Sequence, residues 1–331
     1  MSADELITGE ERIIAEFLAP LTMGDAGALG LKDDCAVMMP PPGHELVLTT
    51  DSLIEGVHFL PGEIPAFKAL AVNVSDLVAK GATPRAYLLT LALPATPTRA
   101  FMQQLAGELR KAQAAFGCHL IGGDTDRTPG PFTLTIAAVG VVLQGHSVRR
   151  NGAREGDLVF VTGSIGDASL GLRLLREPEL ADLARLDAAE REYLLGRFAR
   201  PTPLLAAALL VRRYARAAMD VSDGLVKDLG RLAAASQVKV MADVERVPLS
   251  VPASRMVAAG MAAREKLITG GEDYEVLFTV APEQVEAMNR FAARNAISVT
   301  QIGEVVTGEG CEWRNKSGDR IEFDVGGWEH F

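Results

Sequence analysis

The sequence predicts a two-domain protein that mixes helices and strands, with an α+β half followed by an α/β half. Its 331 residues are too many for a single core of ordinary size. Apolar runs of strand length alternate with segments of helical period along the whole chain. A polar, charged stretch at 149–157 interrupts this pattern and is typical of a domain boundary. We therefore expect an N-terminal domain over 1–148 and a C-terminal domain over 149–331.

The first half predicts a mixed or antiparallel sheet with helices on one face. The turn residues Pro129-Gly130-Pro131 give the last two strands a hairpin-like spacing. Helices are expected at 10–18, 67–78 and 99–116, and strands at 35–39, 45–50, 86–93, 119–121 and 132–143.

The second half begins with an apolar strand and continues with several helices before further strands. Its charged stretch 177–200 has a helical pattern that Pro201 and Pro203 bring to an end. The other expected helices are 168–175, 204–214 and 225–235, and the expected strands are 158–162, 276–280 and 298–302.

Composition and charge exclude several classes of protein. The formal net charge of −10 disfavours nucleic acid as a partner, because its binding sites are basic. No apolar run reaches the roughly 18 residues of a membrane span, and the acidic first residues do not follow the order of a signal peptide. We therefore expect a cytoplasmic protein with no membrane partner.

Sequence motifs narrow the choice further. The patterns GxxxxGK[ST], GxGxxG, HExxH and GxSxG are absent, which disfavours P-loop kinases, Rossmann dehydrogenases, zincins and standard α/β-hydrolases. Three cysteines are too few and too scattered for a disulfide framework or a CxxC metal site. Cys35 and Cys118 lie in apolar runs, and we expect both to be buried.

Acidic residues recur along the chain in turns rich in Gly, Ser or Thr, each beside an apolar run. An unpaired carboxylate at the end of a buried strand costs several kcal/mol. Mg²⁺ removes this cost, because its ligands are oxygen atoms and it bridges carboxylates to substrate phosphates. The pattern therefore predicts a phosphate-handling enzyme that uses metal ions. The acidic residues are Asp33, Asp34, Asp51, Asp76, Asp124, Asp220, Asp223, Glu272 and Asp273.

These motifs also have structural interpretations. The oxygen-bearing side chains of 49–52 either ligate a metal or form a turn or helix cap. Gly122 and Gly123 either let a phosphate approach the backbone, with Asp124 holding its metal, or make a tight turn. In 220–224 a helix cap explains one aspartate but not both.

Alternation along 272–275 would place Asp273 and Glu275 on one face and Glu272 and Tyr274 on the other. His58 is either a structural residue or a contact to phosphate or substrate.

Five motifs, taken in order, resemble those of the thiamine-monophosphate kinase family. They are TTDS at 49–52 with GVHF at 56–59, AVNVSDL at 71–77, GGDT at 122–125, DVSDGL at 220–225 and GGEDYE at 270–275. The resemblance covers nearly the whole chain, from about Gly30 to Trp328. The family belongs to the superfamily of aminoimidazole ribonucleotide synthetase. The resemblance implies an N-terminal α+β domain that dimerises, a C-terminal α/β domain and an ATP site at their junction.

The resemblance also implies site residues. The positions that match metal ligands of the family are Asp34, Thr49, Thr50, Asp51, Asp76, Asp124, Asp220 and Asp223. Those that match its ATP contacts are Gly123, Asp124, Arg150 and Ser222, and those that match its substrate contacts are His58, Glu272 and Trp328. An aromatic plate such as Trp328 suits a flat cationic ring, although a packing role is the alternative. The chain departs from the family at Lys32, where Gly is usual, and at Asp126, where an uncharged residue is more common.

The implied reaction is the Mg²⁺-dependent transfer of the ATP γ-phosphate to thiamine monophosphate, which gives thiamine diphosphate and ADP, in a homodimer. The second pKa of a phosphate is about 6, so the attacking oxygen is already ionised and no catalytic acid or base is assigned. Two alternatives stay open. One is another ATP-dependent enzyme of the superfamily, of the selenophosphate or aminoimidazole ribonucleotide synthetase type. The other is a non-catalytic nucleotide-binding dimer.

Overall fold

The computed structural model describes residues 5–323 and 326–327. The chain divides into two compact units. The first consists of Met1–Leu77 and Ala82–Gly145, and the second of Val78–Gly81 and His146–Phe331.

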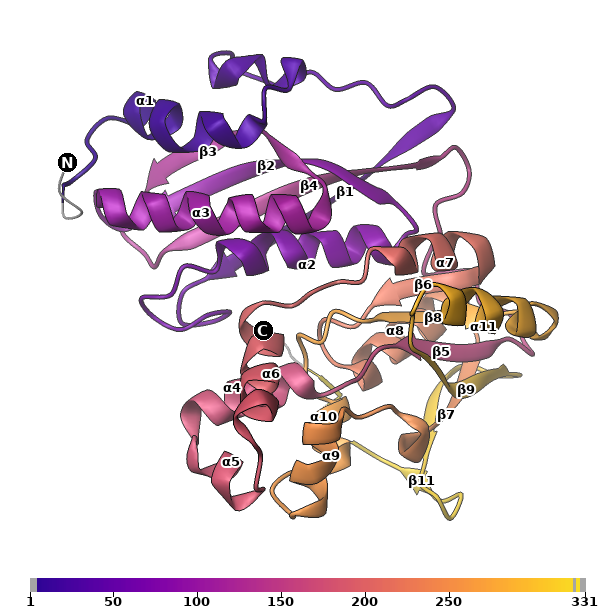
Figure 1. Cartoon of the computed structure of the whole chain (residues 1–331). Coiled ribbons are helices and arrows are strands. Elements are labelled where there is room, and N and C mark those ends of the chain that lie inside the picture. The colour runs from indigo at the N-terminus through magenta and orange to yellow at the C-terminus, as the bar shows by residue number, and fades with distance from the viewer. Residues whose placement is uncertain (1–4, 324–325, 328–331) are drawn as a thin grey trace. The chain divides into compact units, whose positions relative to one another are not determined.

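The first unit contains a four-stranded mixed sheet in the order β1-β4-β2-β3 (Figure 1). β4 pairs antiparallel with both β1 and β2, whereas β3 pairs parallel with β2. The mixed sheet confirms the expectation from sequence, but the hairpin-like spacing is misleading, because β3 and β4 are not neighbours. A Pro- and Gly-rich turn reverses the chain without deciding which strand it then pairs with. The strands are β1 His44–Ile54, β2 Thr83–Leu93, β3 His119–Arg127 and β4 Thr133–Leu143.

Two long helices, α2 (Ala66–Ala79) and α3 (Arg99–Phe116), lie along one face of this sheet (Figure 1). Local signals determine the ends of α3. The Thr98 hydroxyl accepts a hydrogen bond from the Phe101 amide at its start, and Gly117 ends it with a left-handed φ of 70°.

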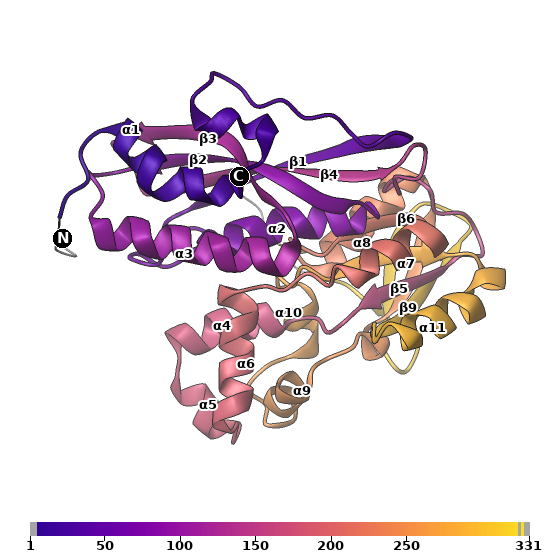
Figure 2. The same cartoon turned by 45° about the horizontal axis from the view of Figure 1, so that its top comes forward.

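A short helix, α1 (Glu10–Ile13), opens the described chain and continues into helical turns at Ile14–Leu18, Ala19–Thr22 and Ala26–Leu31. These turns lie beside β3, as Figures 1 and 2 show. The opening helix at 10–18 is therefore confirmed.

The prediction of a strand at 35–39 is wrong. This segment belongs to no sheet, and the side chains of Val37 and Met39 are 61% and 85% exposed. Its apolar composition has another cause, because Ala36 and Met38 pack against the buried Ala86 and Ile121 of β2 and β3. Burial of Cys118 is confirmed, and burial raises the pKa of its thiol to about 12. Cys35 is instead exposed.

The second unit contains a seven-stranded mixed sheet in the order β11-β10-β7-β9-β5-β8-β6. Its pairs are antiparallel apart from the parallel pair β7 and β10. The strands are β5 Leu158–Thr162, β6 Ala215–Asp220, β7 Lys239–Asp243, β8 Val276–Val280, β9 Val299–Val306, β10 Gly310–Arg314 and β11 Arg320–Ile321.

Helices accompany this sheet, and α8 packs into its aliphatic core through Leu225, Leu229 and Leu232. The helical stretch predicted at 177–200 is two helices, because Asp187 and Glu190 form a capping box that starts a new one. The helices are α4 Asp167–Arg176, α5 Glu179–Leu183, α6 Ala188–Ala199, α7 Ala206–Tyr214, α8 Leu225–Ser236, α9 Val251–Ala258, α10 Arg264–Ile268 and α11 Val285–Arg294. Among the described residues, no helix combines the length and apolar character that crossing a membrane requires.

Candidate functional site

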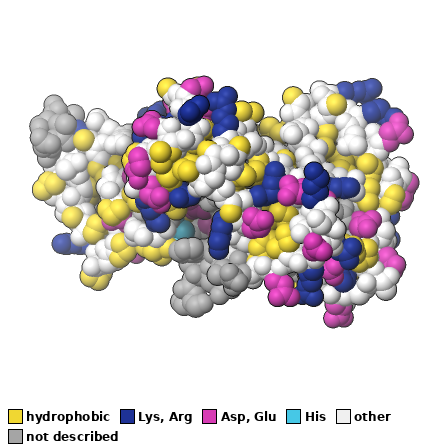
Figure 3. All heavy atoms as spheres, turned by 90° about the horizontal axis from the view of Figure 1, so that it is seen from below, with side chains coloured by type: hydrophobic (Ala, Val, Ile, Leu, Met, Phe, Trp, Pro, Cys, Tyr) yellow, Lys and Arg dark blue, Asp and Glu magenta, His cyan; other side chains and the backbone are white. Residues whose placement is uncertain are grey.

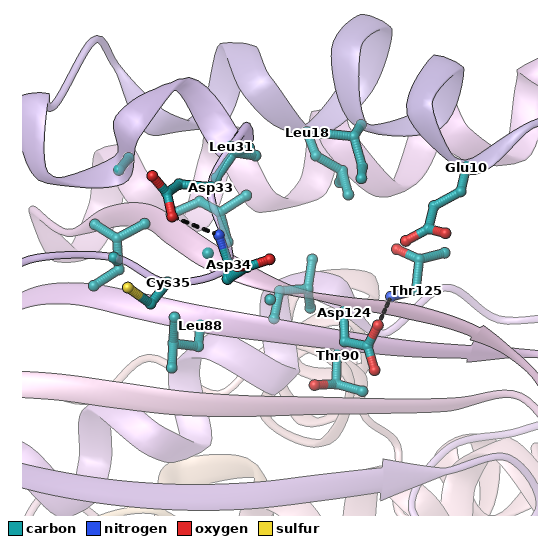
Figure 4. Close-up of a pocket in the computed structure, with 18 residues that line it drawn as sticks. Glu10, Leu18, Leu31, Asp33, Asp34, Cys35, Leu88, Thr90, Asp124 and Thr125 are labelled. Carbon is teal, nitrogen blue, oxygen red and sulfur yellow. Dashed lines mark hydrogen bonds between the residues drawn. The ribbon is translucent and has the colours of Figure 1, made fainter.

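A pocket of about 650 Å³ lies in the first unit, between the N-terminal helical turns and strands β2 and β3. Figure 4 shows acidic side chains from three parts of the chain along it: Glu10 of α1, Asp33 and Asp34 from the segment after the helical turns, and Asp124 from β3. Gly123 also lines the pocket. The fold thus brings together Asp34, Gly123 and Asp124, three of the residues that the sequence assigns to metal or ATP.

Two of the acidic groups of this pocket, those of Asp33 and Asp124, accept hydrogen bonds from the backbone amide of the next residue. The Asp34 amide donates to Asp33 Oδ1 over 2.8 Å, and the Thr125 amide donates to Asp124 Oδ1 over 2.8 Å. In Figure 4 the Asp124 carboxylate lies beside Thr90 of β2. The donors that the pocket offers are oxygen atoms, the kind that a hard cation prefers.

The glycines before Asp124 are part of a strand, so the tight-turn interpretation is wrong. Both lie within β3, which pairs with β2. A Cβ atom on Gly123 would lie 1.8 Å from the backbone oxygen of Leu89, whereas a Cβ on Gly122 would meet side chains alone, a Leu88 methyl group at 3.0 Å and the Ala36 Cβ at 3.9 Å. Gly123 is therefore required by the packing of the two strands, whatever it contacts in a ligand.

A second acidic set lies on β1 and α2. The Thr49 hydroxyl donates a 2.5 Å hydrogen bond to Asp76 Oδ2. Asp51 follows Thr49 by two residues and shares its face of the strand. Thr50 points to the opposite face, where its hydroxyl donates to the Ile136 carbonyl over 3.1 Å. The structure thus places Thr49, Asp51 and Asp76 together and separates Thr50 from them.

The two acidic sets lie on opposite faces and at opposite edges of the sheet. Register pairs connect Ser52, Thr135, Thr90 and Asp124 in one row from β1 to β3. Three strand spacings separate the ends of this row, about 14 Å, and Asp51 points to the other face. One ion cannot bind both Asp51 and Asp124 of the same copy. Accordingly, no three acidic, His or Cys side chains of the part of the chain that the structure describes converge to hold a metal.

His58 is oriented by its own loop. The Ile54 amide donates to His58 Nδ1 over 3.0 Å, so this nitrogen is an acceptor and Nε2 carries the ring proton. The buried Lys68 of α2 donates to the His58 carbonyl, also over 3.0 Å. His58 is therefore suited to donate a hydrogen bond from Nε2 to an anionic or carbonyl group.

In the second unit, the motifs at 220–224 and 270–275 form one structure although 45 residues, 225–269, lie between them. The Glu272 amide donates to the Ser222 carbonyl over 2.7 Å, and the Tyr274 amide donates to the Val221 carbonyl over 2.8 Å. Asp220 is buried at the end of β6, just before these contacts. The fold thus joins Asp220, Ser222 and Glu272, which the sequence assigned to metal, ATP and substrate respectively.

The turn at 222–223 is held by a residue that sequence reasoning did not single out. Buried Asp228 accepts the Ser222 amide over 3.1 Å and the Asp223 amide over 3.0 Å through the same oxygen, Oδ2. Arg231 donates to Asp228 Oδ1 over 2.9 Å and to Asp223 Oδ2 over 2.5 Å. Burial raises the pKa of Asp228. One sequence feature could have revealed this pair: Asp228 and Arg231 are three residues apart on a helix that begins just after the motif, a spacing at which opposite charges interact.

Arg150 and Trp328 are the remaining residues that the sequence assigns to ATP or substrate. Arg150 is exposed, and its carbonyl accepts a hydrogen bond from the Ser236 hydroxyl over 3.0 Å. Trp328 lies outside the described residues.

The chain is similar to known proteins over most of its length. Residues 32–142 match the AIR synthase related protein N-terminal domain, and residues 154–314 match the corresponding C-terminal domain. The thiamine-monophosphate kinase of Caulobacter vibrioides is 39% identical over 96% of this chain and 89% of that relative. That of Escherichia coli is 38% identical over 92% of each.

Solved structures give the same result. The crystal structure of thiamine-monophosphate kinase from Stenotrophomonas maltophilia has a TM-score of 0.82 at 35% identity and covers 93% of this chain and 97% of that one. AaThiL complexed with AMPPCP and TMP has a TM-score of 0.76 at 33% identity and covers 88% and 89%. A hydrogenase maturation protein, HypE, in complex with ATP shares the fold at 18% identity, with a TM-score of 0.75 over 95% and 94%. The resemblance inferred from the five motifs is confirmed, and the chain belongs to the thiamine-monophosphate kinase family.

Proposed function

We propose that this protein transfers the γ-phosphate of ATP to thiamine monophosphate, giving thiamine diphosphate and ADP. The observation that carries the proposal is the match, over most of the chain, to AaThiL complexed with AMPPCP and TMP. The acidic pocket around Asp34 and Asp124 and the joined motifs at 220–224 and 270–275 supply the oxygen donors and backbone groups that such a reaction needs.

The transfer depends on positioning rather than on an acid or base from the protein. The attacking phosphate oxygen is ionised near neutral pH, because the second pKa of a phosphate is about 6. We assign Gly123, Asp124, Arg150 and Ser222 to ATP, and His58, Glu272 and Trp328 to thiamine monophosphate. The Nε2 proton of His58 suits a phosphate oxygen, and the ring of Trp328 suits the cationic thiazolium.

Several Mg²⁺ ions fit the donor chemistry, since each acidic set offers oxygen atoms and Mg²⁺ commonly uses one or two carboxylates together with substrate phosphates. Asp34 and Asp124 would hold one group of ions, with Thr49, Asp51 and Asp76 at a second place. Thr50, Asp220 and Asp223 are the remaining candidates. Bound Mg²⁺ would neutralise charge that otherwise keeps two phosphate groups apart.

The test is to follow ADP and thiamine diphosphate by chromatography, with ATP, Mg²⁺ and thiamine monophosphate present together or singly omitted. We expect equal amounts of both products and no product in EDTA, and Asp124→Asn should abolish turnover while the protein still folds. ADP without thiamine diphosphate would contradict the proposal in favour of another ATP-dependent reaction of the superfamily.

We further propose that the site needs a homodimer. The sets around Asp51 and Asp124 lie at opposite edges of the sheet, so a single site that uses both needs one set from each of two copies. The outward face of the sheet also exposes apolar side chains that a second copy would cover. These are Leu46, Leu48, Leu88 and Leu143, with exposed fractions of 37%, 69%, 38% and 44%.

Mixing two inactive variants tests this arrangement. Asp51→Asn and Asp124→Asn should each be inactive alone, whereas random exchange of their subunits should restore roughly a quarter of the wild-type activity, because half the dimers then contain one intact site. Mixtures that stay inactive after confirmed subunit exchange would contradict a shared site.

We propose small-molecule substrates and a cytoplasmic location. The net charge is −10, and on the face shown in Figure 3 the Lys and Arg side chains are interspersed with Asp and Glu. Both features favour small substrates over nucleic acid. The three cysteines carry free thiols, which is typical of a reducing compartment.

A further inference from the structure

The loop at 270–275 has a backbone that its own residues disfavour. Glu272 and Tyr274 have φ angles of 70° and 52°, in the left-handed region that side chains other than Gly rarely adopt. Such conformations persist only where the surrounding structure imposes them. Something outside the loop must therefore hold Glu272, the residue that we assign to the substrate.

One side of the loop is held by its backbone. The amides of Glu272 and Tyr274 donate to the carbonyls of Ser222 and Val221, and the Glu275 carbonyl accepts the Val221 amide over 2.8 Å. These bonds fix one edge of the loop. Its other side is held by the side chains of Asp273 and Glu275.

Those two side chains both point into the second unit, although the loop forms no strand and strand alternation is not the reason. Asp273 is 1% exposed, and its carboxylate accepts the Gly166 amide over 2.9 Å and the Ala168 amide over 3.4 Å. Glu275 accepts the Thr162 hydroxyl over 2.6 Å. Burial raises the pKa of both carboxyl groups.

Arg197, in the last turn of α6, joins these groups. Its Nη2 atom donates to the backbone carbonyl of Asp273 and to Glu275 Oε1, each over 2.9 Å. Its side chain is 12% exposed. It faces Asp167 and Tyr193 as well as Asp273 and Glu275, and it contributes the positive charge in this cluster. Asp167 is already held by the hydroxyls of Ser164, Tyr193 and Ser250.

We infer that Arg197 is a positioning residue for the substrate: by holding the Asp273 carbonyl and the Glu275 carboxylate, it keeps Glu272 where thiamine monophosphate binds. This inference rests on the proposed function. Arg197 binds Asp273 and Glu275, the residues on either side of Tyr274, and Asp273 directly follows Glu272. Removing the Arg197 side chain therefore frees the strained part of the loop. The bonds from the Glu272 and Tyr274 amides hold only one side of the loop, so they should open more often without Arg197. Ser222 itself is held by Asp228, so the ATP contact at Ser222 should survive.

The test compares Arg197→Met and Arg197→Lys with the wild type. Arg191→Met is the matched control, because Arg191 lies on the same helix with an exposed side chain. Arg197→Met should raise KM for thiamine monophosphate roughly tenfold, which corresponds to about 1.4 kcal/mol of lost binding, with KM for ATP nearly unchanged. Arg197→Lys, which keeps the charge, should be more stable than Arg197→Met, and its KM for thiamine monophosphate should lie between those of Arg197→Met and the wild type. Arg191→Met should behave as the wild type.

Hydrogen exchange gives a second measurement that needs no substrate. The amides of Glu272 and Tyr274 should exchange faster in Arg197→Met and at the wild-type rate in Arg191→Met. This result still decides the role of Arg197 in the loop if the wild type makes no thiamine diphosphate and the proposed function fails. Wild-type exchange and an unchanged KM in Arg197→Met would overturn the inference. Activity that falls only with the folded fraction, at unchanged KM in both Arg197 variants, would also overturn it and leave Arg197 a purely structural role.

Discussion

Replacing Gly123 with Ala should disrupt the sheet of the first unit before it affects any ligand. The added Cβ would lie 1.8 Å from the Leu89 carbonyl oxygen, whereas carbon and oxygen atoms in contact are normally about 3.3 Å apart. The opposing group is backbone, so no side-chain rotation can relieve the clash. Strand β3 must therefore move away from β2 by more than an ångström, and the hydrogen bonds between them must lengthen beyond their normal range.

The cost follows from two contributions. Overpacking of a well-packed region costs about 1–3 kcal/mol, and the loss of about two ladder hydrogen bonds costs about 1 kcal/mol each. We therefore expect the free energy of unfolding to fall by about 4 kcal/mol. For a unit of this size the melting temperature should fall by roughly 10–15 °C.

Gly122→Ala is the matched control, because the tightest contact of its Cβ would be with the end of the Leu88 side chain, which is 38% exposed and can rotate. Thermal unfolding of both variants, followed by circular dichroism and calorimetry, makes the comparison. Melting temperatures within about 2 °C of each other would refute the packing argument. If Gly123→Ala does unfold early, its loss of ATP binding says nothing about a direct contact between Gly123 and the nucleotide.

Three other substitutions test different parts of the fold. Gly107→Ala should stabilise the protein by about 0.5–1 kcal/mol in thermal melts, because Gly107 lies inside α3 with nothing within 4 Å of an added Cβ; a lower melting temperature would contradict this. Asp228→Ala should lower the free energy of unfolding in urea by about 3 kcal/mol, because it leaves two amides of the 222–223 turn without their acceptor; wild-type stability would show that the turn holds itself. Glu312→Gln should destabilise the protein at pH 7, because Lys239 and then Arg314 lower the pKa of Glu312 from 4.5 to about 2. That contribution is complete above pH 4.5 and is lost as the pH falls towards 2, so melts should show a smaller difference from the wild type at pH 2.5, and an undiminished difference would contradict the ion pairing.

Features that depend only on residues close together along the chain could be predicted from the sequence. Helix α3 has the predicted bounds because Thr98 and Gly117 cap it, and β5 and β8 have theirs because each is a short apolar run. The family was also readable from sequence, because its five motifs are short segments whose order survives in the chain.

Tertiary structure decided whatever depends on which segments become neighbours. Residues 35–39 have the composition of a strand but no partner, and the two glycines before Asp124 form a strand because β2 pairs with them. Only the sheet order places Asp51 and Asp124 on opposite faces and edges, although both motifs carry the same chemistry in sequence. Asp228 and Arg197 were missed because an Asp or Arg on a helix is usually solvated. Only the folded structure shows that Asp228 is buried beneath the neighbouring 222–223 turn and that Arg197 reaches the distant loop at 270–275.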